Sequence, residues 1–252
     1  MRIVVLGAKG GVGKSTISLL LSKEYVLEGK KVLLIDRDPL SWASNLIGIK
    51  DPGLLYKVVN GEKIEGSCKT VLERLTVLKF FGDYGRFYYD IKKAEDPSLR
   101  QKLEDAYYSI LKRNFDVYIV DNPSLVTFND EIVEIERNMF RKALSDQKRF
   151  RIYVTDPSES SIEQTKKYIE GLEKGAYGSE GLWGLVVNMI PPFPQEMKNA
   201  EYAVADIENI KIFMPFIEEL FMGQYRIESV KVPEEIKALA KAIQEKVLNY
   251  KK

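Results

Sequence analysis

Residues 9–16 read Lys-Gly-Gly-Val-Gly-Lys-Ser-Thr, between the apolar run Ile3–Leu6 and a segment of helical periodicity from about Lys14 to Glu28. Glycines allow a backbone to curl so tightly that several amide groups point at one centre. The helix that follows places the positive end of its dipole behind those amides. A strand, a glycine-rich loop and a helix in this order predict a phosphate-binding loop.

The residue types of this loop assign roles to individual positions. Lys14 is expected to reach the β- and γ-phosphates of a nucleotide, and the Ser15 hydroxyl to ligate Mg²⁺. The predicted nucleotide-contacting residues are Gly10, Gly11, Val12, Gly13, Lys14, Ser15 and Thr16. The loop departs from the pattern G-x-x-x-x-G-K-[ST], because Ala8 occupies the place of its first glycine and a second lysine, Lys9, stands at the loop entrance.

Outward from the loop, short apolar runs alternate with longer segments of helical period, which is typical of βαβ units around a parallel sheet. The predicted strands are Ile3–Leu6, Val32–Ile35, Leu75–Phe81, Val117–Val120, Ile152–Thr155, Gly184–Asn188 and Ile210–Met214. The clearest other helices are Asp96–Arg113, Ser158–Gly171 and one that begins at Pro233. We therefore predict an α/β fold, a mostly parallel central sheet between two layers of helices, in a single P-loop domain over residues 1–252.

Aspartates follow two of the predicted strands. Asp36 ends the second strand, Asp38 comes two residues later, and Asp121 ends the fourth. In an open parallel sheet, ligands bind beyond the carboxyl ends of the strands. A strand-end aspartate is also a common helix cap or turn residue, so each one alone is weak support for a metal site.

Taken together, K-G-G-x-G-K-[ST], the run Asp36-Arg37-Asp38-Pro39 and the strand 117–121 resemble the ParA/MinD-type deviant Walker-A ATPases. This resemblance implies an ATP-dependent sandwich homodimer that hydrolyses ATP slowly, stimulated by a small activator protein, with Mg²⁺ as cofactor. It implies that Lys9 crosses the dimer interface to the partner's nucleotide and that Asp38 holds the attacking water. It further implies that Ser15, Asp36 and Asp121 support the metal. Leu40 departs from the Gln that is usual in the family's partition branch, and Asn122 departs from the Thr or Ala that family members often show.

For the base, the guanine-reading string N-K-x-D is absent, which argues against GTP. By the same resemblance, Asn188 is expected to read the adenine edge, and Pro215 and Phe216 to pack near the base. An asparagine at a strand end is also a frequent turn former.

Composition excludes several classes of function. With 38 Lys and Arg against 37 Asp and Glu, no global field favours nucleic acid, and the absence of histidine excludes His-based catalysis and His-ligated metals. The single cysteine, Cys68, excludes an intrachain disulfide and a four-cysteine metal site. We see no targeting pattern and no apolar run long enough to span a membrane, and therefore expect a cytoplasmic protein without stable membrane insertion.

Three biological roles remain open. Nonspecific DNA binding for plasmid or chromosome partition is favoured by a run of cations, Arg137, Arg141, Lys142, Lys148, Arg149 and Arg151, although a solvated helix face explains it equally well. A MinD-like membrane-positioning role would use the apolar stripe of the last helix, which more often packs on its own domain. Cofactor assembly or client delivery is the third. An aromatic segment, Phe80–Tyr89, is either core or a partner surface.

Overall fold

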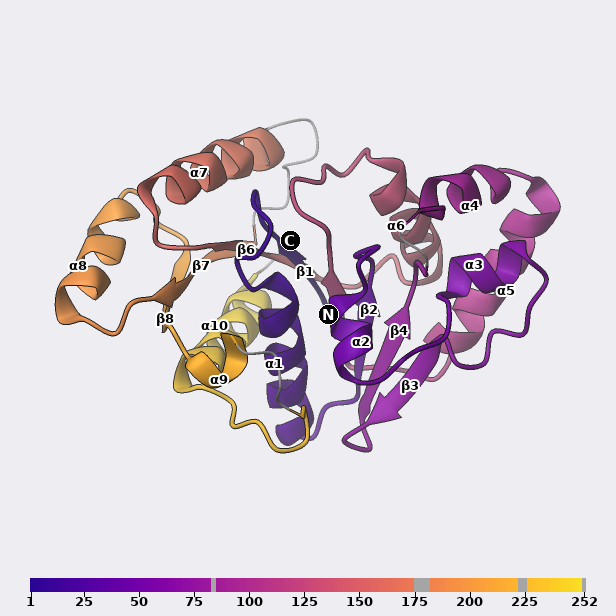
Figure 1. The fold of residues 1–252 in the computed structure, drawn as a ribbon, viewed down its shortest axis with the longest axis horizontal. Coiled ribbons are helices and arrows are strands. Elements are labelled where there is room, and N and C mark those ends of the chain that lie inside the picture. Colours follow the sequence, from indigo (N-terminus) through magenta and orange to yellow (C-terminus); the bar gives the residue numbers. More distant parts are fainter. Residues whose placement is uncertain (83–84, 175–181, 222–225, 251–252) are drawn as a thin grey trace.

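Eight strands form one sheet in the computed structural model, which describes residues 1–82, 85–174, 182–221 and 226–250 (Figure 1). The strands are β1 (Arg2–Leu6), β2 (Val32–Asp36), β3 (Cys68–Val71), β4 (Leu75–Lys79), β5 (Val117–Asp121), β6 (Arg149–Thr155), β7 (Trp183–Ile190) and β8 (Ile210–Pro215). They lie in the order β3-β4-β2-β5-β1-β6-β7-β8, and every neighbouring pair is parallel except β3 with β4.

Helices cover both faces of this sheet. They are α1 (Lys14–Leu27), α2 (Trp42–Leu46), α3 (Leu54–Val59), α4 (Phe87–Lys93), α5 (Pro97–Leu111), α6 (Glu131–Ala143), α7 (Glu159–Lys174), α8 (Pro194–Ala203), α9 (Glu218–Phe221) and α10 (Glu234–Asn249). Residues of α1, α2 and α10 form one apolar cluster with Ile3 and Val5 of β1. Residues of α3 to α8 form a second apolar cluster on the opposite face of the sheet (Figure 1). The predicted three-layer α/β/α architecture is confirmed.

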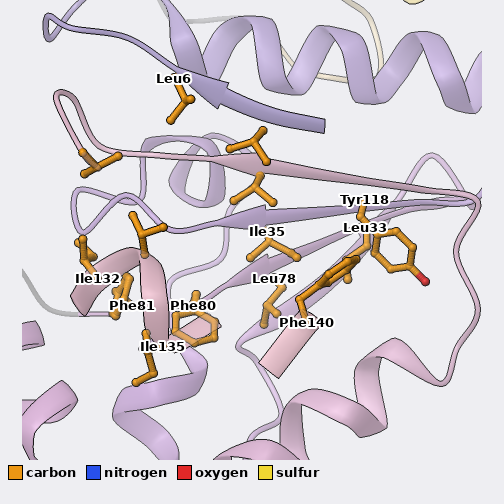
Figure 2. Packing of buried hydrophobic residues seen from close by; sticks show 14 of the residues in the cluster. Leu6, Leu33, Ile35, Leu78, Phe80, Phe81, Tyr118, Ile132, Ile135 and Phe140 are labelled. Carbon is orange, nitrogen blue, oxygen red and sulfur yellow. The ribbon is translucent and has the colours of Figure 1, made fainter. Parts of the chain in front are cut away.

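The two faces of the sheet bury alternate residues of the same strands. Ile3 and Val5 pack under α1, whereas Val4 and Leu6 pack on the opposite side. Figure 2 shows that second side, where Leu33, Ile35, Leu78 and Tyr118 point from the strands toward α6. Strands β1, β2, β4 and β5 are buried over their whole length, which explains why apolar residues predominate in each of them.

Register brings the ends of the three central strands together. The Cα partner of Asp121 on β2 is Asp36, and its partner on β1 is Val5. The loop from Gly7 to Gly13 begins two residues after Val5. The two predicted strand-end aspartates and the glycine-rich loop therefore meet at one edge of the sheet, as the parallel topology requires.

One strand was not predicted from the sequence. β3 pairs antiparallel with β4 through a turn in which Leu72 and Glu73 have φ values of 50° and 61°. Such turns usually carry Asn-Gly or Gly, and neither is present here, so the hairpin signal is missing. The strand predicted over Leu75–Phe81 ends at Lys79.

The aromatic segment divides between core and surface. Phe80 and Phe81 are fully buried, with their ring centroids 5.0 Å apart in an edge-on arrangement (Figure 2). Tyr88 and Tyr89 on α4 are instead more than half exposed. Tyr84 lies outside the described residues. Core packing thus explains the first part of the segment, while the second part forms surface.

Candidate nucleotide-binding site

The glycine-rich loop has the backbone geometry that phosphate binding needs. Gly11 and Gly13 have φ values of 78° and 90°, a left-handed region that L side chains rarely adopt. A Cβ on Gly13 would lie 2.3 Å from Nδ2 of Asn188, so a larger residue at position 13 would also clash with this side chain. Gly13 is also the N-cap of the 14-residue helix α1, and no side chain caps that helix end. Its orphan amides and dipole are therefore available to an anion.

Lys14 lies inside this loop and is almost fully buried. Its Nζ donates to Oγ of Ser124 at 2.8 Å and lies 3.5 Å from the carbonyl oxygen of Lys9. Burial lowers the pKa of Lys14, and the nearby charges of Asp121 and Asp38 oppose that shift. An ammonium group at this place has few partners and would gain from a phosphate oxygen.

Two carboxylates lie side by side at the strand ends, and both are fully buried. Burial and the charge of Asp36 raise the pKa of Asp121 to about 7. Burial likewise raises the pKa of Asp36 to about 6, against hydrogen bonds from Ser44 that lower it. Without a cation, the two neighbouring carboxylates resist being ionised at the same time. A divalent cation would stabilise both anions, so this pair is suited to bind one.

The residues present fit magnesium, and the geometry separates their roles. Oδ2 of Asp121 has no hydrogen-bond partner within the described part of the chain, which is unusual for a buried carboxylate. Asp36 is already occupied, since Oδ2 accepts from the amide and hydroxyl of Ser44 at 2.8 and 2.7 Å and Oδ1 accepts from the amide of Asp38 at 3.2 Å. Asp121 and half-buried Ser15 are therefore the residues that would hold the ion, with Asp36 in an outer position.

Asp38 lies on the loop after β2 and is half-buried. Its Oδ1 accepts from the amide of Leu40 at 2.9 Å, and its carbonyl accepts from the amide of Ser41 at 2.8 Å. These bonds form a compact turn that holds the carboxylate in place. Leu40, the residue whose amide makes the first of these bonds, is 62% exposed.

Lys9 lies at the rim of the site and contacts its own chain. Its Nζ lies 2.9 Å from Oδ2 of Asp156 and 3.1 Å from Oγ of Ser161. Although partial burial raises the pKa of Asp156, hydrogen bonds from Ser158 and from Lys9 lower it to about 2. The Lys9 side chain remains half exposed, so this ion pair is a weak tether.

The predicted base-binding residues come together beside the loop. Asn188 on β7 is buried, and its Nδ2 donates to the carbonyl of Val12 at 2.9 Å. A pocket next to it is lined by Thr16, Ile17, Asn188, Met189, Met214, Pro215, Phe216, Ile217, Leu220 and Phe221. Phe216 and Phe221 face each other there with ring centroids 5.2 Å apart. The structure thus places all three predicted residues, including Pro215, at one apolar hollow against α1.

The six cations proposed for DNA do not form one exposed surface. Arg151 is a correction, because it is buried on β6 and its guanidinium binds Glu173 with two hydrogen bonds of 2.6 Å. The Lys148 Nζ donates to main-chain carbonyls at the end of α10. Lys142 pairs with Glu104 at 2.7 Å, Arg137 with Glu134 at 3.6 Å, and Arg149 is half-buried. Arg141, Lys142 and Lys148 are the exposed members.

The apolar stripe of α10 is covered. Ile236, Leu239, Ala240 and Ile243 have no exposed surface, and Val247 has 7%. The helix packs against α1 in the same layer (Figure 1). Along residues 1–82, 85–174, 182–221 and 226–250, no helix has both the length and the apolar character that a membrane crossing needs.

Sequence reasoning missed two residues that join the loops of the site. Arg37 is 2% exposed, although it stands between two acidic residues in a loop. Its guanidinium donates to Oδ1 of Asn122, the residue that follows Asp121. The only sequence signal was that Asn122 departs from the family pattern.

A glycine loop between the central strand and its helix, a buried lysine in that loop and two strand-end aspartates define a P-loop nucleotide-binding protein. The chain belongs to the family described as CobQ/CobB/MinD/ParA nucleotide binding domain, which matches residues 3–221.

Individual relatives agree with this assignment. The chromosome-partitioning ATPase Soj of Thermus thermophilus is 38% identical over 65 residues, which are 26% of this chain and 26% of that protein. The chain spans less than two thirds of the length of such relatives: it matches 26% of Soj, and 64% and 59% of two bacterial MinD proteins. The cell division ATPase MinD of Pyrococcus furiosus superposes with a TM-score of 0.65 at 24% identity, over 97% of this chain and 98% of that one. MinD of Pyrococcus horikoshii, a complex with Mg-ADP, gives 0.62 at 22% identity over 97% and 94%.

Proposed function

We propose that the chain is a magnesium-dependent ATPase that works as a nucleotide-switched homodimer. The observation that carries this proposal is the unpaired Oδ2 of buried Asp121 beside the glycine loop and Lys14. The Mg-ADP complex of the Pyrococcus horikoshii relative supports the same choice of ligand. We place the purine base beside Asn188, Pro215 and Phe216, which lie together at the end of the loop.

The residues divide the work between binding and hydrolysis. The amides of the loop and Lys14 would hold the β- and γ-phosphates, while Ser15 and Asp121 would hold the metal. The ion would neutralise charge on the phosphates and orient them. The turn holds Asp38 in place through its Oδ1, which accepts from the amide of Leu40. The other carboxylate oxygen, Oδ2, would align the attacking water.

Hydrolysis is tested with Asp38→Ala and a matched control, Asp105→Ala on the exposed side of α5. The first variant should still bind a fluorescent ATP analogue within about threefold of the native affinity, and should lose roughly 10²-fold or more in turnover. The control should match the native protein in both. If Asp38→Ala retains native turnover, Asp38 does not align the attacking water. If the native protein shows no magnesium-dependent hydrolysis, the chain is not an ATPase.

The dimer is tested through Lys9. Release of Lys9 from Asp156 would let it reach a nucleotide on a second copy, where a cation supplied in trans stabilises the transferred phosphoryl group. Lys9→Ala should bind ATP, remain monomeric in analytical ultracentrifugation and hydrolyse roughly 10³-fold more slowly. Lys30→Ala, also an exposed lysine, is the control. Dimeric and active Lys9→Ala would contradict the proposal.

For the biological role we propose partition or positioning of a cargo, with nonspecific DNA as the surface. The burial of the α10 stripe favours DNA over lipid, since Ile236, Leu239 and Ile243 pack on the domain and are not available to a bilayer. The exposed cations Arg141 and Lys142, at the end of α6, are the residues that would contact phosphate. A small activator protein would then stimulate hydrolysis and release the dimer.

This role is tested with ATP-loaded protein on random-sequence duplex DNA and, separately, on anionic phospholipid vesicles. Arg141→Glu should weaken DNA retention, and the native affinity should fall steeply with added salt. Lys241→Glu, an exposed lysine on α10, should not change retention. Binding to vesicles without binding to DNA would instead establish the membrane-positioning alternative.

A further inference from the structure

Arg37 is a charged residue in an unexpected place. It lies between Asp36 and Asp38, yet its side chain is directed away from them, and 2% of it is exposed. Its guanidinium donates through Nε to Oδ1 of Asn122 at 3.0 Å and through Nη1 to the carbonyl of Val133 at 3.0 Å. Both acceptors belong to the segment that runs from β5 into α6. Burying an arginine is costly, so its partners must be well placed.

Asn122 carries the connection onward to β1, the strand that leads into the phosphate loop. While its oxygen accepts from Arg37, its Nδ2 donates to the carbonyl of Val5 on β1 at 2.9 Å. The main chain adds parallel links, because the amide of Arg37 donates to the carbonyl of Asp121 at 2.9 Å and the amide of Leu125 to that of Gly7 at 2.9 Å. One buried amide group therefore ties together the three segments that form the site.

A buried carboxylate anchors this connection to the core. Glu136 on α6 accepts from Nη1 of Arg37 at 2.9 Å and from both terminal nitrogens of Arg2, at 2.9 and 2.6 Å. The hydroxyl of Tyr107 donates to the same carboxylate. Neighbouring side chains of α6, such as Ile132, pack into the apolar layer under the sheet (Figure 2). The anchor is thus part of the rigid core rather than of a loop.

We propose that Arg37 is a positioning residue for ATP hydrolysis, which acts by clamping the loop that carries Asp38 to Asn122 and Glu136. This inference rests on the proposed ATPase function and adds a determinant of its turnover. A displacement of about 1 Å in a catalytic group can cost roughly 10²-fold in rate. The planar guanidinium serves three acceptors at once, which the single ammonium of a lysine cannot do in the same geometry.

Arg37→Met and Asn122→Ala break the clamp from its two sides. Arg37→Met leaves Glu136 paired with Arg2, so the buried carboxylate keeps a counter-charge and the fold is retained. Arg74→Met is the matched control, because Arg74 is exposed and donates to the carbonyl of Gly29. For each variant the turnover number, the dissociation constant for a fluorescent ATP analogue and the urea midpoint are measured.

Both clamp variants should lose roughly 10- to 100-fold in turnover while the ATP affinity stays within about threefold, because Lys14 and the loop amides do not depend on Arg37. Arg37→Lys should recover only part of the loss. The double variant should be no slower than Arg37→Met alone, since both changes break one connection.

Three outcomes would overturn the inference. Native turnover in folded Arg37→Met, an equal loss of affinity and turnover, or strictly additive effects in the double variant would each show that Arg37 does not position the hydrolytic loop. If the native protein itself hydrolyses no ATP, the proposed function fails instead. If native hydrolysis is abolished by Asp38→Ala but retained by Arg37→Met, the function stands and only the inference on Arg37 is overturned.

Discussion

Replacing Glu136 by glutamine would test the buried charge network most directly. Glu136 has no exposed surface and accepts from Arg2, Arg37 and Tyr107. A glutamine has almost the same volume but no charge, and its NH₂ group would face arginine donors. Glu136→Gln therefore leaves two buried guanidinium groups without a counter-ion while the packing of α6 hardly changes.

The structure gives a magnitude for this change. Burial alone would raise the pKa of Glu136, but the charges of Arg2 and Arg37, with hydrogen bonds from Arg2 and Tyr107, lower it from 4.5 to about 2. At about 1.4 kcal/mol per pKa unit, that difference corresponds to roughly 3 kcal/mol in favour of the folded carboxylate. Breaking a buried ion pair by removing one partner typically costs about 3–5 kcal/mol, which agrees.

The sign of the pH dependence follows from the lowered pKa. The contribution of Glu136 is fully present above 4.5, the ordinary pKa of the group, and is lost as the pH falls toward 2. The difference in the free energy of unfolding between the native protein and Glu136→Gln should thus be largest at neutral pH. It should shrink once the pH falls below about 4.

Urea denaturation followed by circular dichroism measures this difference. With a denaturant slope of about 3 kcal/mol per M, a loss of roughly 3 kcal/mol moves the midpoint by about 1 M. Glu134→Gln is the control, because Glu134 lies on the same helix, is 41% exposed and contacts Arg137 at 3.6 Å. It should move the midpoint by less than about 0.2 M. A shift below about 0.3 M for Glu136→Gln at pH 7, or an unchanged shift in acid, would refute the reasoning.

Two further predictions concern the site and the fold. Because the pKa of Asp121 is raised to about 7 and that of Asp36 to about 6, the folded apo protein should gain stability relative to Asp121→Asn as the pH falls from 8 to 6, by up to about 1.4 kcal/mol per pH unit. Equal pH profiles for the free energy of unfolding would contradict the raised pKa values, and saturating Mg²⁺ should reduce the difference. Gly53→Ala should cost roughly 1–3 kcal/mol or prevent folding, since the new Cβ would lie 2.1 Å from the carbonyl oxygen of Phe81. Gly171→Ala, in a helix with nothing within 4 Å of the new Cβ, should instead be neutral or stabilising in thermal denaturation.

Much of the fold could be predicted because local signals agreed with the topology. The buried strands are mostly apolar. Helix α5 begins as predicted, with Asp96 capping the amides of Ser98 and Leu99 and with Pro97 in its first turn. β3 was missed because its turn lacks glycine. Its half-exposed edge position also gives it a mixed burial pattern that periodicity does not detect.

Within the site, local sequence determined the loop and the order of the acidic residues. Phosphate binding depends on the conformation of a few consecutive residues, so glycines at 10, 11 and 13 and lysine at 14 already specify it. The meeting of Asp36 and Asp121 also follows, because parallel strands end at one edge of the sheet. Their raised pKa values do not follow, since these depend on burial that only the packed layers create.

Contacts between distant segments were decided by tertiary structure alone. A run of cations in the sequence gave no sign that Arg151 would be buried against Glu173. Nor did a lysine in the loop reveal that it would pair with Asp156 across 147 residues. Arg37 likewise looks like a solvated residue between two aspartates until α6 brings Glu136 within 2.9 Å of it. Charge pairing acts over a few ångströms in space, and sequence separation carries no information about that distance until the helices are packed on the sheet.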